Sequence, residues 1–184
     1  MPDSVAKKMS NFLEFAEKYY YFLYMASDTI ITWQKSYSVN IPLIDSQHME
    51  LINLTNKLYR SCLKDNEYSK EIFMEVLQGA LSYVGYHFSV EEKIMERVNY
   101  SGINAHKTEH KNFVKMVLAT IEELAKDSTV NPMNFVKYLK NWVLNHIAVS
   151  DTALGNYLIR LRQFGTLDNI SLKIKTVEGR YVIE

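Results

Sequence analysis

Apolar side chains recur every three or four positions along most of this chain, a spacing that predicts amphipathic helices. Asp45, Ser69 and Asn104 can cap three of these segments, and Asn131-Pro132 is a typical start for a fourth. The four predicted helices cover residues 46–63, 69–98, 104–124 and 132–161. Short polar stretches join them, so we expect an up-down-up-down four-helix bundle in which neighbours in sequence are antiparallel.

Two flanking regions depart from this pattern. Residues 5–25 predict an extra N-terminal helix, in which seven aromatic side chains lie between Phe12 and Tyr24. Such a helix has three possible contacts: the main domain, a second subunit in a homodimer, or a membrane surface. Beyond Gly165, alternating apolar positions predict a short hairpin that packs on the bundle or on a second subunit.

These features divide the chain into three parts. We expect an N-terminal helical extension in residues 1–30, the bundle in 31–163 and a C-terminal hairpin extension in 164–184. Within the second part, residues 28–44 lack a helical repeat and predict an extended arm lying over the bundle.

Composition narrows the class of protein. Forty-seven per cent hydrophobic residues with six glycines and three prolines favour an all-α fold. The 21 basic and 21 acidic residues cancel, which argues against nucleic-acid binding. Cys62 is the single cysteine, so a disulfide framework or a thiolate-rich metal site is excluded. The sequence contains no apolar run long enough for a membrane span and no pattern typical of a signal peptide, so we expect a cytoplasmic setting.

The candidate chemistry lies in histidines and acids at helical spacing. His87 and Glu91 are four residues apart, as are His106 and His110, so each pair shares a helix face. In an antiparallel bundle these pairs fall at one level with side chains from the other two helices. The seven candidate metal ligands are His48, His87, Glu91, His106, His110, His146 and Asp151.

One pair does not fit a regular helix. His146 and Asp151 are five residues apart, which separates their side chains by about 140° around an ideal helix. Both can face the bundle interior only if the helix widens between them, so we predict a π-type turn there.

Seven ligands exceed the needs of one metal ion. Five imidazoles with two carboxylates suit two ions that share the carboxylates, and they favour iron or manganese over calcium, which prefers oxygen ligands. We therefore expect two irons.

The residues that carry this chemistry resemble the hemerythrins of bacteria. The resemblance covers residues 31–160 and includes Ile-Asp-Ser-Gln-His ending at His48, His-Phe-Ser-Val-Glu-Glu from His87, and the run from Trp142 to Ile147 followed by Asp151. It implies that His106, His110 and His146 hold one iron and that His48 and His87 hold the second. It also implies bridges from Glu91, Asp151 and an oxide or hydroxide, with an open position for dioxygen on the second iron.

The expected function is reversible dioxygen binding for storage, delivery or buffering, with no catalytic residues and no enzymatic activity. The alternatives are a di-iron oxidase, peroxidase or nitric-oxide reductase, or an oxygen-sensing module that acts on a partner. With only two carboxylates to stabilise ferric ions, release of oxygen should be favoured. The expected oxygen pocket consists of apolar side chains close to the ligands: Leu51, Phe88, Trp142, Val143 and Ile147.

Overall fold

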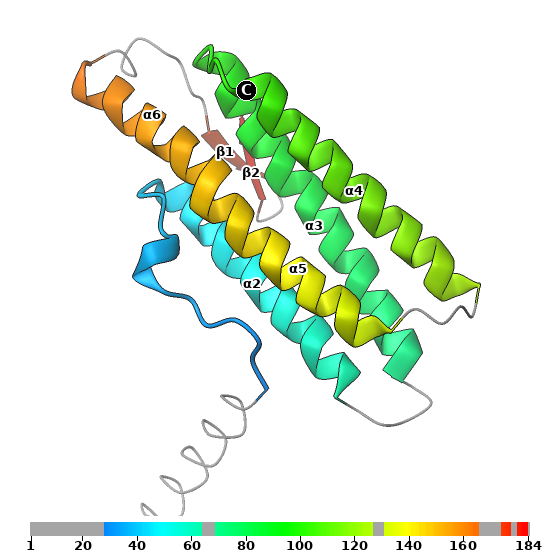
Figure 1. Ribbon diagram of the computed structural model, residues 1–184. Coiled ribbons are helices and arrows are strands. Elements are labelled where there is room, and N and C mark those ends of the chain that lie inside the picture. Colours follow the sequence, from blue (N-terminus) through cyan, green and yellow to red (C-terminus); the bar gives the residue numbers. More distant parts are fainter. Residues whose placement is uncertain (1–27, 64–68, 127–130, 166–173, 178–179, 184) are drawn as a thin grey trace, which may run out of the picture.

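Four antiparallel rods form the molecule in the computed structural model, which describes residues 28–63, 69–126, 131–165, 174–177 and 180–183 (Figure 1). The first three rods are the helices α2 (Pro42–Cys62), α3 (Ser69–Arg97) and α4 (Ile103–Ala125). The fourth rod consists of α5 (Pro132–His146), the π-helical turn η2 (Ile147–Asp151) and α6 (Thr152–Gln163). The predicted all-α up-down-up-down bundle is confirmed.

Two of the predicted helix starts are confirmed. The second helix of the bundle, α3, begins at Ser69 as expected, and α5 begins at Pro132. The Asn131 side chain caps α5, because its Oδ1 accepts a hydrogen bond from the Met133 amide at 2.9 Å.

The other two starts were placed wrongly from the sequence. Helix α2 begins at Pro42, earlier than expected, since proline is well suited to the first helical position. Asp45 therefore lies inside the first turn, where its carboxylate accepts from the Ser38 hydroxyl at 2.6 Å and the Val39 amide at 2.8 Å. Helix α4 follows Gly102 without a side-chain cap, so Asn104 is also inside its helix.

The segment before α2 forms the predicted extended arm, interrupted by the single turn η1 (Lys35–Tyr37). Asn56 of α2 fixes its beginning, because its Oδ1 accepts from the amides of Ile30 and Ile31 and its Nδ2 donates to the Ile31 carbonyl. At the other end Val39 packs against Gly155, where an added Cβ would lie 2.7 Å from the Val39 carbonyl oxygen. The arm is thus tied to both α2 and α6.

The core has two apolar parts at different levels of the bundle. One part fills the half that contains the α2–α3 connection and includes Leu58, Phe73, Leu77 and Leu139. The other lies toward the opposite end and is built by Val39, Ile44, Val90, Met95, Leu154 and Leu158. Between these levels the interior is polar, which is where the candidate ligands lie.

A small hairpin follows the bundle. Strands β1 (Ile174–Val177) and β2 (Arg180–Ile183) pair antiparallel, with Ile174 opposite Ile183, and β2 lies beside α3. The predicted hairpin is confirmed for these two strands, whereas its expected beginning at Ile170 and the aromatic helix at 5–25 lie outside the described residues. Among the helices that the structure describes, none is long and apolar enough to cross a membrane.

Candidate metal centre

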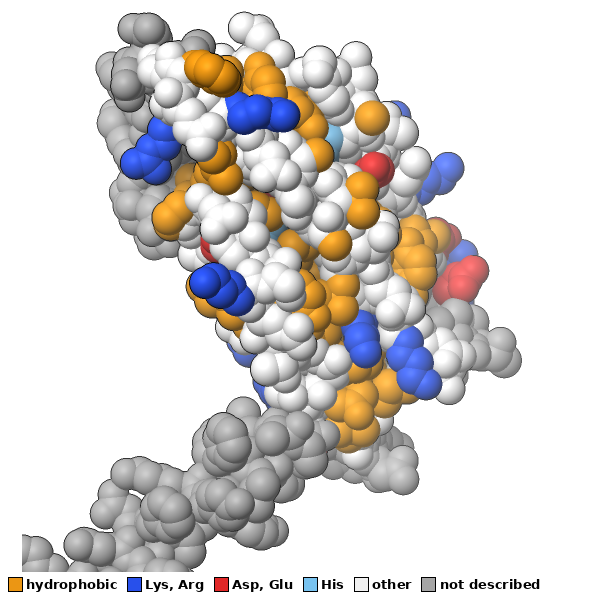
Figure 2. Space-filling model, turned by 60° about the vertical axis from the view of Figure 1, so that its left-hand side comes forward, with side chains coloured by type: hydrophobic (Ala, Val, Ile, Leu, Met, Phe, Trp, Pro, Cys, Tyr) orange, Lys and Arg blue, Asp and Glu red, His pale blue; other side chains and the backbone are white. Residues whose placement is uncertain are grey.

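All seven candidate ligands meet inside the bundle at one level. His48 comes from α2, His87 and Glu91 from α3, His106 and His110 from α4, and His146 and Asp151 from the fourth rod. None of the seven side chains is more than 4% exposed. Because the histidines are buried, only small areas of histidine are visible on the face of the molecule drawn in Figure 2.

Asp151 stands between the two ends of this cluster. Its Oδ2 lies 3.0 Å from His48 Nε2, whereas its Oδ1 lies 3.3 Å from His106 Nε2 and 3.2 Å from His146 Nε2. The two oxygens of one carboxylate therefore face different sets of imidazoles, as a bridging ligand requires.

Glu91 also lies at the centre of the cluster, but its contacts come from a single oxygen. Its Oε2 lies 3.3 Å from His110 Nε2, 3.4 Å from His106 Nε2 and 3.7 Å from His87 Nε2. The ligand atoms form two overlapping groups, each spanning no more than 4.8 Å. One contains Glu91, His106, His110 and His146, and the other contains His48, His87, Glu91 and Asp151.

The predicted π-type turn is confirmed, and it explains how His146 and Asp151 come together. Residues Ile147–Asp151 adopt the π-helical turn η2, which adds one residue to the turn. The Thr152 hydroxyl donates to the Ile147 carbonyl at 2.8 Å, which helps to satisfy the backbone of this widened turn. Asp151 consequently faces the interior and is fully buried.

Burial and neighbouring charges shift the pKa values of the cluster. Burial together with the nearby His48 lowers the pKa of His87 to about 3, and burial together with His146 lowers that of His110 to about 2. Burial and the Asp151 charge raise the pKa of Glu91 to about 8. In the metal-free site His87 and His110 are therefore neutral, which is the form of imidazole that binds metals.

Asp151 and His106 lie close together and shift in opposite directions. Burial acts against a charge on both side chains, but the close imidazoles of His106 and His48 hold the pKa of Asp151 below its usual range. For His106, the neighbouring carboxylates of Asp151 and Glu91 outweigh burial and raise its pKa to about 9. Asp151 is thus the anionic centre of the metal-free cluster.

Buried atoms without hydrogen-bond partners test whether a metal fits. Within the described residues, such atoms include both oxygens of Glu91 and of Asp151 and the Nε2 atoms of His48 and His106. Leaving buried polar atoms unpaired costs about 1–3 kcal/mol each, so a protein rarely keeps so many in one place without a ligand. The donor set of imidazole nitrogens and carboxylate oxygens suits iron, manganese or zinc ions, and the two groups fit two ions.

Comparison with known proteins agrees with this geometry. The family model for the hemerythrin HHE cation binding domain matches residues 39–158. The chain belongs to the hemerythrin family. Its match to the bacteriohemerythrin of Methylococcus capsulatus has 30% identity over 129 residues, covering 68% of this chain and 95% of that protein. The bacteriohemerythrin of Clostridium acetobutylicum is 27% identical over 126 residues, which cover 66% of this chain and 96% of the relative.

A solved structure shares the fold. The crystal structure of a wild-type hemerythrin superposes with a TM-score of 0.64 at 26% identity, covering 70% of this chain and 97% of that one. Crystal structures of variants of a hemerythrin match with the same TM-score. The family match leaves residues 1–38 and 159–184 of this chain outside it.

Three of the hemerythrin-type histidines have a second contact through the other ring nitrogen. His87 Nδ1 lies 3.1 Å from Gln47 Oε1, His110 Nδ1 lies 3.1 Å from Glu92 Oε1, and His146 Nδ1 lies 2.9 Å from Glu109 Oε2. Each ring then turns its Nε2 toward the centre of the cluster. The sequence analysis assigned no role to Gln47, Glu92 or Glu109. A usable signal was that all three are immediate neighbours of candidate ligands in the sequence.

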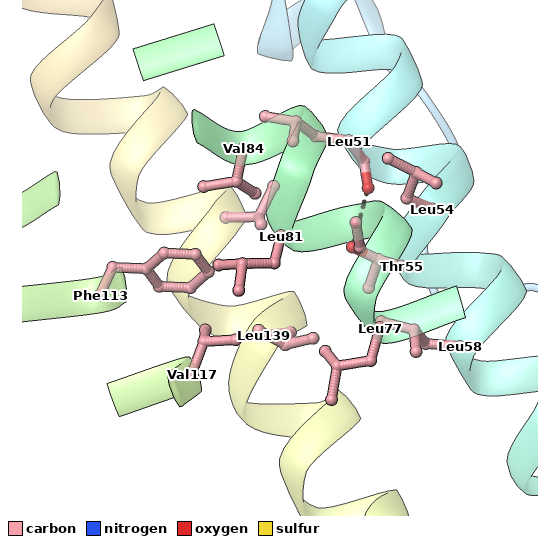
Figure 3. Close-up of a pocket in the computed structure, with 12 residues that line it drawn as sticks. Leu51, Leu54, Thr55, Leu58, Leu77, Leu81, Val84, Phe113, Val117 and Leu139 are labelled. Atoms are coloured by element: carbon pink, nitrogen blue, oxygen red, sulfur yellow. Dashed lines mark hydrogen bonds between the residues drawn. The ribbon is translucent and has the colours of Figure 1, made fainter. Parts of the chain in front are cut away.

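Of the five residues predicted to form an oxygen pocket, two line an apolar cavity of about 30 Å³ next to the cluster. Leu51 and Val143 belong to its wall, together with Leu58, Leu77 and Leu139 (Figure 3). Figure 3 shows the labelled leucines Leu51, Leu58, Leu77 and Leu139 around a common space between α2, α3, α4 and α5. An apolar space of this kind stays free of water.

The other three predicted pocket residues lie against the cluster and do not line that cavity. Phe88 stacks on His110 with ring centroids 3.6 Å apart, and Trp142 stacks on His146 at 4.5 Å. Ile147 is 1% exposed at the start of η2. These side chains form apolar walls around the imidazoles.

Proposed function

We propose that this chain binds dioxygen reversibly at a pair of iron ions held by the seven buried side chains. The observation that carries the proposal is the position of Asp151, whose two oxygens face separate sets of imidazoles at 3.0–3.3 Å. Membership of the hemerythrin family and the names of its bacterial relatives support it.

The ligands divide unequally between the two ions in this proposal. His106, His110 and His146 would hold one iron and His48 and His87 the other, while Glu91 and Asp151 would contribute to both positions. The second position has one imidazole fewer, so it would offer more room for a diatomic ligand. The iron pair would supply the electrons for binding the gas, and the surrounding side chains determine what else can reach it.

The side chains around the cluster suit reversible binding. Phe88 and Trp142 cover His110 and His146, and the leucine-lined cavity offers dioxygen an apolar space beside the site. Exclusion of water and protons from this space protects the bound gas from side reactions. The donor set also contains only two carboxylates, so ferric ions gain less electrostatic stabilisation than in carboxylate-rich di-iron proteins.

Optical spectroscopy tests the proposal. The anaerobically reduced, iron-loaded protein should be nearly colourless, develop ferric charge-transfer bands in air and lose them again under vacuum. Glu91→Gln, which neutralises one proposed bridge, should remove this cycle. Bands that persist after degassing contradict reversible binding, and steady turnover of peroxide or nitric oxide with a reductant would instead support an enzyme.

We place this function in the cytoplasm, where Cys62 would stay reduced. A homodimer through the aromatic N-terminal segment remains part of the proposal. Sedimentation of the full chain, compared with a chain that begins at Asp28, measures whether residues 1–27 support a dimer.

A further inference from the structure

We propose that the two metal positions fill in a fixed order, with Glu92 and Glu109 as the positioning residues that favour the three-histidine position. A metal ion enters among His106, His110 and His146 first, and a second ion enters at His48 and His87 afterwards. This inference rests on the proposed two-metal site and adds a role for residues outside its ligand set.

Glu92 is held in place to orient His110. Its Oε1 lies 3.1 Å from His110 Nδ1, and its Oε2 forms a salt bridge of 3.2 Å with Lys107 Nζ. Lys107 also contacts Glu96 at 3.0 Å. The ion pairs restrict the carboxylate of Glu92, so that it accepts the Nδ1 proton of His110 and leaves Nε2 free to bind metal.

Glu109 does the same for His146 from α4. Its Oε2 lies 2.9 Å from His146 Nδ1 and accepts a hydrogen bond of 2.6 Å from the Ser150 hydroxyl. Ser150 belongs to η2, the widened turn that also brings Asp151 inward. The widened turn η2 therefore has two effects. It brings the ligand Asp151 inward, and through Ser150 it supports Glu109, the partner of His146.

The two-histidine position has weaker support. His87 Nδ1 contacts the neutral amide oxygen of Gln47 at 3.1 Å, and Nδ1 of His48 is buried without a hydrogen-bond partner in the described structure. No carboxylate holds the outer nitrogen of either ring in that part of the chain. These imidazoles therefore lack both the added negative charge and, for His48, a contact that fixes the ring.

Charge and orientation together decide the order. A carboxylate that accepts the outer N–H of a ligating imidazole makes the ring a stronger donor, and losing such a partner typically lowers metal affinity by about 10- to 100-fold. The position at His48 and His87 lies near both Glu91 and Asp151, so the inner carboxylates alone do not favour the other position. Glu92 and Glu109 supply the difference.

Zinc titration of the metal-free full-length protein tests the order. With nitrogen-15 histidine labelling, the first equivalent of zinc should shift the Nε2 resonances of His106, His110 and His146, and the second should shift those of His48 and His87. Filling of the His48–His87 position first would overturn the inference. A chain that binds a single zinc ion would instead contradict the two-metal site itself.

Substitutions of the outer carboxylates test their role. Glu92→Gln and Glu109→Gln should each weaken the first zinc-binding step by about 10- to 100-fold in chelator competition while changing the second step little. Ser150→Ala, which touches no imidazole, should weaken the first step by a smaller factor. The matched controls are Glu75→Gln on α3 and Glu122→Gln on α4, both exposed and remote from the imidazoles.

The affinity of the first zinc-binding step decides whether the outer carboxylates have the proposed role. Unchanged affinity in both Glu92→Gln and Glu109→Gln, with circular dichroism like that of the parent, overturns the role of these carboxylates. Gln47→Glu provides an independent test, because an added carboxylate beside His87 Nδ1 should strengthen the second zinc-binding step. No change there would also count against the inference.

Discussion

The metal-centre layer of the bundle and the apolar layer beside it are equally buried, yet they differ in what stabilises them. The side chains of Leu58, Phe73 and Leu77 are 1–2% exposed and belong to one apolar cluster. Around Glu91 and Asp151, buried oxygens have no hydrogen-bond partners. The first layer can form without any ligand, whereas the second becomes favourable only when cations occupy it.

This difference assigns separate roles to the two layers. Burying a large apolar side chain contributes about 1.5–3 kcal/mol, so the apolar layer can hold the fold together by itself. The polar layer works against folding until metal binds, because unpaired buried atoms destabilise it. Stability of the bundle and occupancy of the site should therefore be separable by experiment.

The largest expected effect is that of metal on stability. Binding at two sites, with free metal about 1,000 times above Kd at each, adds about 4 kcal/mol per site and thus about 8 kcal/mol to the free energy of unfolding. Denaturant unfolding under anaerobic conditions, without metal and with free ferrous iron held about 1,000 times above Kd, measures it. In Asp151→Asn, the metal-induced gain should shrink sharply; an unchanged gain would contradict the bridging position.

A cavity in the apolar layer should have the next largest effect, without dependence on metal. Phe73→Ala removes a ring that is 2% exposed and packs edge-to-face on Phe135, so it should cost about 3–5 kcal/mol. Phe73 precedes His87 by 14 residues, or about 21 Å along α3, so iron content should be unaffected. Phe164→Ala, at a side chain 81% exposed, is the control and should change stability by less than about 0.5 kcal/mol.

The metal-free protein should be most stable near pH 6.5. The pKa values of His87 and His110 are lowered on folding from 6.5 to about 3 and about 2, so acid favours the unfolded chain below pH 6.5. The pKa of Glu91 is raised from 4.5 to about 8, so its contribution is lost as the pH rises from 4.5 to 8. The pKa of His106 is raised from 6.5 to about 9, so its contribution is lost between pH 6.5 and 9, and both losses act above pH 6.5.

Thermal unfolding between pH 4 and pH 9 measures this maximum. Between pH 4.5 and 6.5, Glu91 opposes the two histidines, so the decline on the acid side should steepen below pH 4.5. Bound metal holds the ligands deprotonated, so it should remove the decline above pH 6.5 and steepen the decline on the acid side, where the unfolded chain takes up protons. A metal-free protein whose stability rises steadily from pH 6.5 to pH 9 would contradict the assigned shifts.

Filling the cavity should have the smallest effect on stability, and its main effect should be on the rate of oxygen binding. Val84 lines the cavity and is 8% exposed, so Val84→Ile adds one methylene to a space of about 30 Å³. We expect a stability change below about 1.5 kcal/mol, unchanged iron content and slower oxygen association by flash photolysis. Val149→Ile, at a side chain 60% exposed, is the matched control.

The bundle and the seven clustered side chains were predictable from the sequence, because the spacing of residues along a helix determines the direction in which their side chains point. The four-residue pairs predict shared faces, and the five-residue interval from His146 to Asp151 predicts a widened turn, which η2 confirms. Helices pack in a bundle in only a small number of ways. The side-chain directions were therefore enough to predict that the seven candidate ligands meet in the interior.

Features that depend on contacts between segments were not predicted. Asp45 has the right chemistry for a helix cap, but in the structure its carboxylate binds Ser38 and Val39 of the arm, and the helix starts at Pro42. Glu109 was missed because its contact with His146 joins α4 to α5, and no spacing within one helix reveals such a contact.

The central claim is that these side chains hold two iron ions on either side of Asp151. Anaerobic titration of the metal-free protein with ferrous iron, followed by metal analysis of the desalted protein, tests it most directly. The account predicts two irons per chain in the parent protein and a loss of the pair in Asp151→Asn. Saturation of the parent at one iron per chain, or retention of both irons in Asp151→Asn, would contradict it.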